Sequence, residues 1–409
     1  MGKLRKVVVL VGDGMGDDPV PELNGKTPLM VAKLPWMRRI AAAGNRLLIK
    51  TVPDGLAPGS DVANMGLLGY DARKNYTGRA AIEAAGQGLK LEPGDVAFRT
   101  NLVTIGADGT MEDYSAGDMP TDDGRALIAS LAEAAEKTNP ALKFHGGVSY
   151  RHLLVWHNGP TQLAFNPPHE ISGRAIADNL PAGPRADEML ALMELSRHVF
   201  AHHPVNEARR SQGKRPATQI WPWGAGAAMA LEPYARRYGR QGAVVTAVDL
   251  VRGLANLAGL TPVAVPGATG WIDTNYTGKG HAAIHAIRDG ATFAYVHVEA
   301  PDECGHKGLP HEKIGAMEAI DTLIVAPVWH ALEALGEPYR LVMAMDHRTP
   351  VTRRGHTGAP VPIAWLDGPL NVPLDSYPEA QFDEAIAPTP EPDGSLPLAC
   401  HLMDRLLRI

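Results

Sequence analysis

Three parts of the chain carry carboxylate and imidazole side chains at spacings that could hold a divalent metal ion. Asp302 and His306 stand four residues apart, so a helix would turn both side chains the same way, toward one ion. Asp346 and His347 are adjacent at the end of an apolar run and would leave a strand on opposite sides. His356 follows on a loop that returns to the next apolar run. Taken singly, each has a plainer explanation, such as a solvated helix start, a helix cap or a histidine satisfied in the core.

Asp13 adds a third carboxylate, directly after the first apolar run of the chain. Three aspartates and three histidines form a mixed oxygen and nitrogen set, which suits two ions of the manganese, zinc or cobalt kind rather than a calcium cage. Two ions held about 4 Å apart clamp the attacking and leaving oxygens of an in-line phosphoryl displacement. The six residues together therefore predict phosphoryl-transfer chemistry.

Ser60 is the candidate nucleophile for that chemistry. It lies in Ala57-Pro58-Gly59-Ser60, where a tight turn leads into a helix-like run. Unpaired N–H groups and the positive end of a helix dipole would favour an alkoxide there, and later a phosphate. A helix cap formed by Ser60 or Asp61 is the structural alternative, and it is compatible with catalysis.

The elements that position these residues are predicted by four short apolar runs, at 7–11, 293–298, 341–345 and 361–365. Apolar residues at helical spacing occupy 247–258 and 312–335, and Pro327 should kink or divide the second helix. Strands joined by helical crossovers predict an α/β fold, with a mostly parallel sheet covered by helices on both faces. Ligands of such sheets bind beyond the carboxyl ends of the strands, so the acidic residues and histidines should meet at one edge.

The middle of the chain, 76–216, lacks the alternating strand and helix pattern of the rest. Pro and Gly residues interrupt it repeatedly, and 186–200 has apolar residues at helical spacing. At 409 residues the chain is longer than one hydrophobic core usually supports. We therefore expect a core domain at 1–75 and 217–409, with an α+β unit inserted at 76–216.

Composition narrows the class of ligand. The chain is 45% apolar and 21% charged, as is typical of a globular protein, and its net charge of −6 offers no basic excess for nucleic acid or an anionic membrane. A small ligand is the better expectation. The two cysteines, Cys304 and Cys400, indicate no disulfide framework, and the first apolar run is too short for a signal peptide. These features predict a cytoplasmic protein. They do not indicate whether the protein is a monomer or an oligomer.

The order of these motifs resembles the alkaline phosphatase superfamily and, within it, the archaeal-type cofactor-independent (2,3-bisphosphoglycerate-independent) phosphoglycerate mutases. The resemblance covers nearly the whole chain. It runs through Gly69-Tyr70-Asp71, Tyr76-Thr77-Gly78-Arg79, Tyr150-Arg151-His152, Trp221-Pro222-Trp223-Gly224, Asp273 to Lys279 and Glu299 to His306. It implies an isomerase of glycolysis with an alkaline-phosphatase-like core, in which the inserted unit is a lid that excludes water.

The resemblance also implies roles for individual residues. One ion would be held by Asp302, His306 and His356, and the other by Asp13, Asp346, His347 and Ser60 Oγ. Ser60 would carry the phosphoryl group between the hydroxyls of 3-phosphoglycerate and 2-phosphoglycerate without added bisphosphoglycerate. Manganese is the first choice of metal, with zinc, cobalt or magnesium as alternatives. Cations for the substrate phosphate and carboxylate would come from Arg79, Arg151 and Lys279, with His152 as an acid or base.

Several alternatives stay open at this point. The Arg-rich lid signature of the better-known bacterial enzymes has no match, and relatives of this subgroup have been proposed to act as homoserine kinases. A phosphomonoesterase or phosphodiesterase would use the same serine and metals. A sulfatase is disfavoured because Cys304 precedes Gly-His, and a dinucleotide site is disfavoured because Asp17 stands where a third Gly is needed. A non-catalytic metal-binding protein is the remaining hypothesis.

Overall fold

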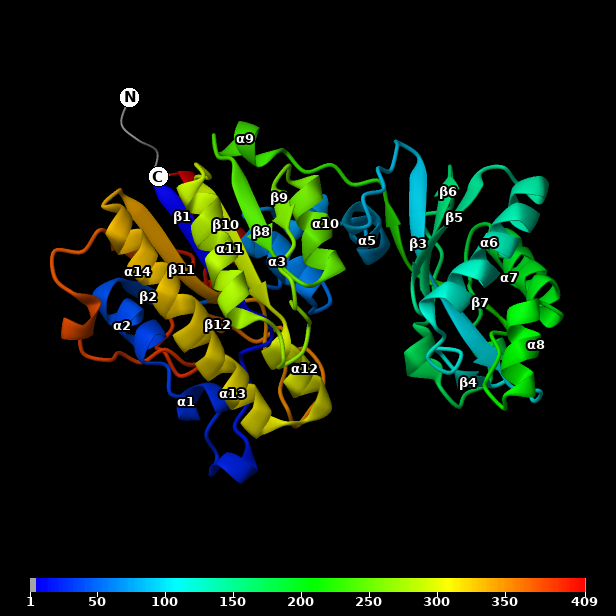
Figure 1. Cartoon of the computed structure of the whole chain (residues 1–409), viewed down its shortest axis with the longest axis horizontal. Helices are drawn as coiled ribbons and strands as arrows, with labels where there is room; N and C mark the ends of the chain where they lie inside the picture. Colours follow the sequence, from blue (N-terminus) through cyan, green and yellow to red (C-terminus); the bar gives the residue numbers. More distant parts are fainter. Residues whose placement is uncertain (1–4, 409) are drawn as a thin grey trace. The chain divides into compact units, whose positions relative to one another are not determined.

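The structure is a computed structural model that describes residues 5–408. The chain divides into two compact units (Figure 1): one comprises the described residues up to Tyr76 and from Ala230 onward, and the other is Thr77–Met229. The insertion expected from the sequence ended at 216. In the structure, strand β7 (Gln219–Ala227) pairs with β3 (Asp95–Ile105) and so belongs to the second unit.

The first unit is built on a seven-stranded sheet in the order β2-β12-β11-β1-β10-β8-β9. The strands are β1 (Lys6–Gly12), β2 (Asn45–Ile49), β8 (Gly242–Val245), β9 (Thr261–Val263), β10 (Phe293–Val298), β11 (Tyr339–Met345) and β12 (Val361–Gly368). β1 runs parallel to β10 and β11, whereas β12 is antiparallel to both of its neighbours. All four predicted strands form, and the sheet is mixed but mostly parallel, which confirms the α/β prediction. β1 is central because its β-branched residues are buried on both faces.

Helices cover this sheet on the face turned toward the viewer in Figure 1, where α11 (Tyr276–Arg288) lies beside α14 (Ala326–Leu335). The predicted helix at 312–335 is divided into α13 (Pro310–Ile320), a π-helical turn η4 (Asp321–Val325) and α14. Pro327 lies in the first turn of α14, in a helical backbone that continues from η4 into α14, so its missing N–H removes one intrahelical hydrogen bond there. The other predicted helix is α10 (Asp249–Leu257).

Two helices of the first unit carry predicted site residues. α3 (Ser60–Leu67) begins at the predicted nucleophile, directly after Gly59, and packs with α10 and α15 (Ala399–Arg408). α12 (Ala300–Lys307) follows β10 after a single residue. The remaining helical segments of the unit are η1 (Pro21–Leu23), α1 (Pro28–Val31), α2 (Pro35–Ala43), α4 (Ala72–Asn75), α9 (Tyr234–Arg237) and η5 (Leu374–Ser376).

The second unit has an antiparallel sheet in the order β4-β3-β6-β5, with β7 also pairing with β3. Its other strands are β4 (Met111–Asp113), β5 (Leu142–Val148) and β6 (Arg151–His157). One face packs on α5 (Arg79–Gly86) and the other on α6 (Thr121–Thr138) and α7 (Ala186–Ala201), because alternate strand residues enter two separate hydrophobic clusters. The short segments η2 (Pro168–Ile171), η3 (Ala177–Asn179) and α8 (Pro204–Ser211) complete it. Among the described residues, no helix combines the length and apolarity that crossing a membrane requires.

Candidate active site

The predicted site residues of the first unit meet at one edge of its sheet. β10, β1 and β11 are adjacent and parallel, so their carboxyl ends lie side by side. Asp13 follows β1, Asp346 follows β11, and α12 brings Asp302 and His306 in just beyond β10. This is the edge at which open α/β sheets bind ligands.

Asp13 and Asp346 form the deepest part of the site and are 1% and 0% exposed. The two oxygens of Asp346 accept hydrogen bonds from Gly14 N (2.9 Å) and Asn64 Nδ2 (3.0 Å). Asp13 Oδ1 has no hydrogen-bond partner among the described residues and lies 3.5 Å from His347 Nε2. Burial raises the pKa of Asp13 well above its usual value, and the carboxylates of Asp346 and Asp302 raise it further.

Asp302, His306 and His356 converge next to this pair. His306 Nε2 lies 3.3 Å from Asp302 Oδ2 and 2.9 Å from His356 Nε2, and His356 Nε2 lies 3.3 Å from Asp302 Oδ1. Burial favours a raised pKa for Asp302, but the hydrogen bonds from the two imidazoles outweigh it and hold this pKa well below the usual range. The bond to Asp302 in turn raises the pKa of His306 to about 9.

His347 connects the two groups and the serine. It shares one potential metal-ligand group with Asp13 and Asp346, and a second with Asp302 and His356. Its Nε2 is 3.1 Å from Ser60 Oγ. Ser60 is the first residue of α3, the N-cap residue is Gly59, and the free N–H of Val62 in the first turn donates to Asp61 Oδ1 (2.9 Å) and not to Ser60. The hydroxyl of Ser60 is therefore directed at the cluster and does not serve as a helix cap.

The donor chemistry of this cluster fits divalent metal ions. Three carboxylates lie close together, and the ion pairs that they make within the described chain come from histidines rather than from Lys or Arg. His306 Nδ1 lies 3.1 Å from the carbonyl oxygen of Arg354, which can only accept. That contact places a proton on Nδ1 and leaves Nε2 as the atom that can bind an ion. Clustered negative charge with converging nitrogen lone pairs is the arrangement that a divalent cation stabilises.

Sequence reasoning missed the residues that orient this cluster. His297, inside β10, is fully buried, with Nε2 2.9 Å from Asp13 Oδ2. Asn64, one helical turn after Ser60, also donates to Ser60 O (2.9 Å) and accepts from Tyr295 Oη (2.6 Å). Thr349 donates to Asp302 Oδ1 and lies 3.2 Å from His347 Nδ1. A histidine in an otherwise apolar strand was the one available signal.

Lys279 lies in the same unit, on α11, and is fully buried. Its ammonium donates to the carbonyl oxygen of His297 (3.2 Å). Burial lowers the pKa of Lys279 to about 8, although the Glu299 carboxylate opposes this shift. The other two cations predicted to bind the substrate, Arg79 and Arg151, belong to the second unit.

Arg79 contacts a half-buried carboxylate in the second unit, Glu83, and the charge of Arg151 also acts on this carboxylate. Arg79 Nε lies 2.8 Å from Glu83 Oε1, and Arg99, which was not predicted, lies 3.0 Å from Glu83 Oε2. Burial favours a raised pKa for Glu83, but Arg99, Arg79 and Arg151 together bring this pKa below its usual value. Burial, with the charges of the other two arginines, lowers the pKa of Arg99 to about 10. Three guanidinium groups against one carboxylate leave excess positive charge on the α5 face of the sheet.

His152 is not brought together with these arginines. It neighbours Arg151 in β6 and therefore points to the opposite face of the sheet, where α6 covers it. Its Nδ1 accepts from Gly147 N (3.1 Å), and burial lowers its pKa to about 4.

Fold and site together define an α/β enzyme with candidate metal-binding groups and a serine hydroxyl at one sheet edge. A family profile for 2,3-bisphosphoglycerate-independent phosphoglycerate mutase matches residues 41–206. The chain is 46% identical over 359 residues to that mutase of Methanothrix thermoacetophila (88% of this chain, 90% of the relative). It is 47% identical over 359 residues to one from Methanothermobacter thermautotrophicus (87% of each chain).

Two solved structures are also similar. A protein from Pyrococcus horikoshii has a TM-score of 0.74 at 27% identity and covers 91% of this chain and 90% of its own. The cofactor-independent phosphoglycerate mutase of Thermoplasma acidophilum has a TM-score of 0.63 at 25% identity and covers 99% of both chains. The chain belongs to the family of archaeal-type 2,3-bisphosphoglycerate-independent phosphoglycerate mutases. It is therefore an isomerase of glycolysis, as the motifs predicted.

Proposed function

We propose that this enzyme interconverts 3-phosphoglycerate and 2-phosphoglycerate through a phosphoserine on Ser60, with two divalent ions at the Asp/His cluster. The observation that carries the proposal is the 3.1 Å approach of Ser60 Oγ to His347, the residue shared by both ligand groups. A hydroxyl at a helix N-terminus with no capping duty is placed as a nucleophile would be. The relatives above are phosphoglycerate mutases, so the homoserine kinase and phosphatase alternatives find no support among them.

The chemistry needs two displacements at phosphorus. In the first, Ser60 Oγ bonds to phosphorus as the bond to the C3 oxygen breaks and that oxygen gains a proton. In the second, the C2 hydroxyl oxygen of the same glycerate attacks, and Ser60 recovers its proton. Divalent ions, when bound by Asp13, Asp346 and His347 and by Asp302, His306 and His356, would supply charge neutralisation for the phosphoryl oxygens and the serine alkoxide. The first amides of α3 add positive potential at the same place.

The second unit is proposed as the lid and as part of the substrate site. Arg79 and Arg151, joined by Arg99, offer the forked donors that carboxylate and phosphate bind well. The phosphoserine must return its phosphoryl group to glycerate before water reaches it, which requires a closed cavity. The proposed reaction does not use His152, because its imidazole packs under α6.

A product assay tests this reaction directly. Manganese-loaded enzyme is given 3-phosphoglycerate without bisphosphoglycerate, and 2-phosphoglycerate and free phosphate are measured together. We expect 2-phosphoglycerate as the main product and slow phosphate release. Phosphate as the main product would replace the mutase mechanism with a phosphatase one.

Lys279 carries a prediction about pH. Its pKa of about 8 is lowered from the ordinary 10.5, so the ammonium is mostly charged at pH 7 and mostly neutral at pH 9. If this charge binds the substrate, KM for 3-phosphoglycerate should be flat below pH 8 and rise up to about tenfold per pH unit above it. In Lys279→Met, KM should be high at every pH and lack this rise. A wild-type KM that stays constant from pH 7 to pH 9.5 would contradict the assignment.

His297 is predicted to orient Asp13 for metal binding. Its Nε2 lies 2.9 Å from Asp13 Oδ2 without a hydrogen bond of regular geometry, and Asp13 Oδ1 also has no hydrogen-bond partner among the described residues. Loss of such an orienting partner typically weakens metal binding by about 10–100-fold. His297→Ala should therefore show a manganese dissociation constant raised by that factor, measured by calorimetry, with activity recovering at high manganese. His297→Gln keeps a hydrogen-bond donor, so its manganese dissociation constant should lie between those of the wild type and His297→Ala. An unchanged dissociation constant in His297→Ala would refute the role.

A further inference from the structure

Asp71, Cys400 and His401 form a second group of metal-ligating side chains, separate in sequence and in chemistry from the cluster at Ser60. All three belong to the first unit. We propose that this group binds one zinc ion, with a water molecule as the fourth ligand, and that the ion fastens helix α15 to the segment that follows α3. The proposal is independent of the phosphoserine mechanism.

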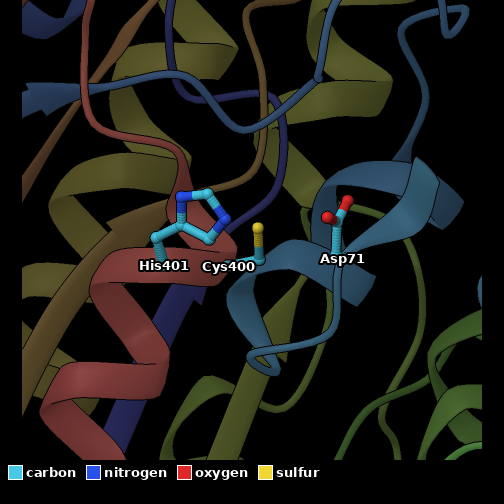
Figure 2. A group of neighbouring side chains, drawn as sticks. All are labelled: Asp71, Cys400 and His401. Atoms are coloured by element: carbon cyan, nitrogen blue, oxygen red, sulfur yellow. The ribbon is translucent and has the colours of Figure 1, made fainter. Parts of the chain in front are cut away.

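The three donor atoms already converge. An oxygen of Asp71, Cys400 Sγ and a ring nitrogen of His401 all lie within 4.8 Å of one another. Figure 2 shows the thiol of Cys400 between the imidazole and the carboxylate, with the first two residues on α15 and Asp71 on the segment before α4. Donors of a tetrahedral zinc site are roughly 3.3–3.8 Å apart, given metal–ligand bonds of about 2.0–2.3 Å. The present limit of 4.8 Å is about 1 Å beyond these separations, so the site closes through small movements, including one of the exposed His401 side chain.

Asp71 is held in place by its neighbour. It caps α4 by accepting from Arg73 N (3.1 Å), and its two oxygens accept from Arg73 Nε (2.9 Å) and one Arg73 Nη (2.8 Å). Ligating carboxylates are commonly oriented by such outer hydrogen bonds. Asp71 Oδ1 accepts two of these bonds and Oδ2 accepts one, so Oδ2 is the oxygen that keeps a lone pair for an ion. Arg73 neutralises Asp71, so the negative charge that a dication needs must come from a Cys400 thiolate.

Cys400 is 5% exposed and lies in the first turn of α15, where the helix dipole favours an anion. Burial and the Asp71 carboxylate nevertheless raise the pKa of the Cys400 thiol, so the thiolate would form only as the ion binds. All three ligands line one cavity of about 1170 Å³, which gives an ion a path and leaves room for its water. Binding releases the thiol proton to solvent. Thiolate and imidazole are softer ligands than carboxylate and select zinc over manganese. The group of Asp71, Cys400 and His401 would therefore prefer a different metal from the Ser60 cluster.

The consequence for the fold is a link between distant segments. α15 packs against α3, the helix that begins at Ser60, and Asp71 lies four residues after α3 ends. A metal ion that bridges Asp71 to Cys400 and His401 would tie the C-terminal helix to this support. We therefore expect the ion to raise thermal stability and to take no part in the reaction.

Cobalt replaces zinc as a spectroscopic probe in the test. Manganese-loaded full-length enzyme is titrated with Co²⁺, and the near-ultraviolet charge-transfer band that requires a thiolate–cobalt bond is recorded. We expect the band to saturate at one cobalt per chain, to disappear on adding zinc, and to be absent in Cys400→Ser. It should persist in Cys304→Ser, the matched control at the only other cysteine. The Ser60 cluster has no thiolate among its proposed ligands, so failure of the two-metal mechanism would leave this signal unchanged.

Two more variants keep the result independent of folding defects. His401→Ala removes an exposed ligand and should weaken cobalt binding by about tenfold or more, with the unfolding transition of the metal-free protein unchanged. Arg73→Gln keeps all three ligands and should retain the band. No band in the wild type, a band that survives Cys400→Ser, or equal cobalt affinity in His401→Ala would each overturn the proposal.

Discussion

Replacing Ser60 with alanine is expected to lower mutase activity by about four orders of magnitude or more while the protein stays folded. The substitution removes the oxygen proposed to carry the phosphoryl group, and losses of this size follow removal of a covalent nucleophile. The hydroxyl caps no helix and its neighbour in the cluster is His347, so the free energy of unfolding should change by less than about 1 kcal/mol. Initial rates and chemical denaturation of both proteins measure the two effects.

The same variant has a chemical readout. Acid quenching during turnover, followed by peptide mass spectrometry, should place a phosphate on Ser60 of the wild type and on no residue of Ser60→Ala. Ser211→Ala is the matched control, because that serine ends α8 in the second unit and its hydroxyl bonds only to Ala208 O (2.8 Å) among the contacts of the described chain. If Ser60→Ala keeps near-wild-type turnover, the phosphoserine mechanism is wrong.

The second large effect is expected at His347, the residue that belongs to both ligand groups. Elemental analysis of manganese-reconstituted wild-type protein should return about two ions per chain. His347→Ala should retain about one ion and lose about 10³-fold or more in turnover, because the proposed site of Asp13 and Asp346 loses its nitrogen ligand. His347→Gln preserves most of the side-chain volume and separates loss of the metal from loss of packing.

A matched histidine controls for nonspecific metal binding. His285 is exposed on α11, with Nδ1 3.6 Å from Asp289 Oδ2. His285→Ala should keep both ions and full activity. Retention of two manganese ions by His347→Ala, or one ion or none in the wild type, would contradict the two-metal assignment.

Much of the first unit could be predicted because its signals are local. A run of β-branched residues such as 7–11 has few options other than a strand buried on both faces, and a proline inside a long helical pattern, such as Pro327, kinks or divides that helix. Parallel sheets bind ligands beyond the carboxyl ends of their strands, so Asp13 and Asp346 could be assigned to one edge of the sheet from the sequence. The second unit was harder to delimit, since β7 follows two helices and a short linker, and its pairing with β3 is a contact between distant residues.

The sequence by itself determined the family, the fold class and the set of residue types that meet at the sheet edge, because the motif order, the apolar runs and the residues after each strand are all written locally. Tertiary structure alone decided which atoms meet. It joined His347 to both ligand groups, placed His297 against Asp13, and turned His152 away from Arg151. It also brought Asp71 beside Cys400 across more than three hundred residues. Side-chain convergence of this kind depends on strand register and helix packing, which act between distant residues and leave no spacing in the sequence.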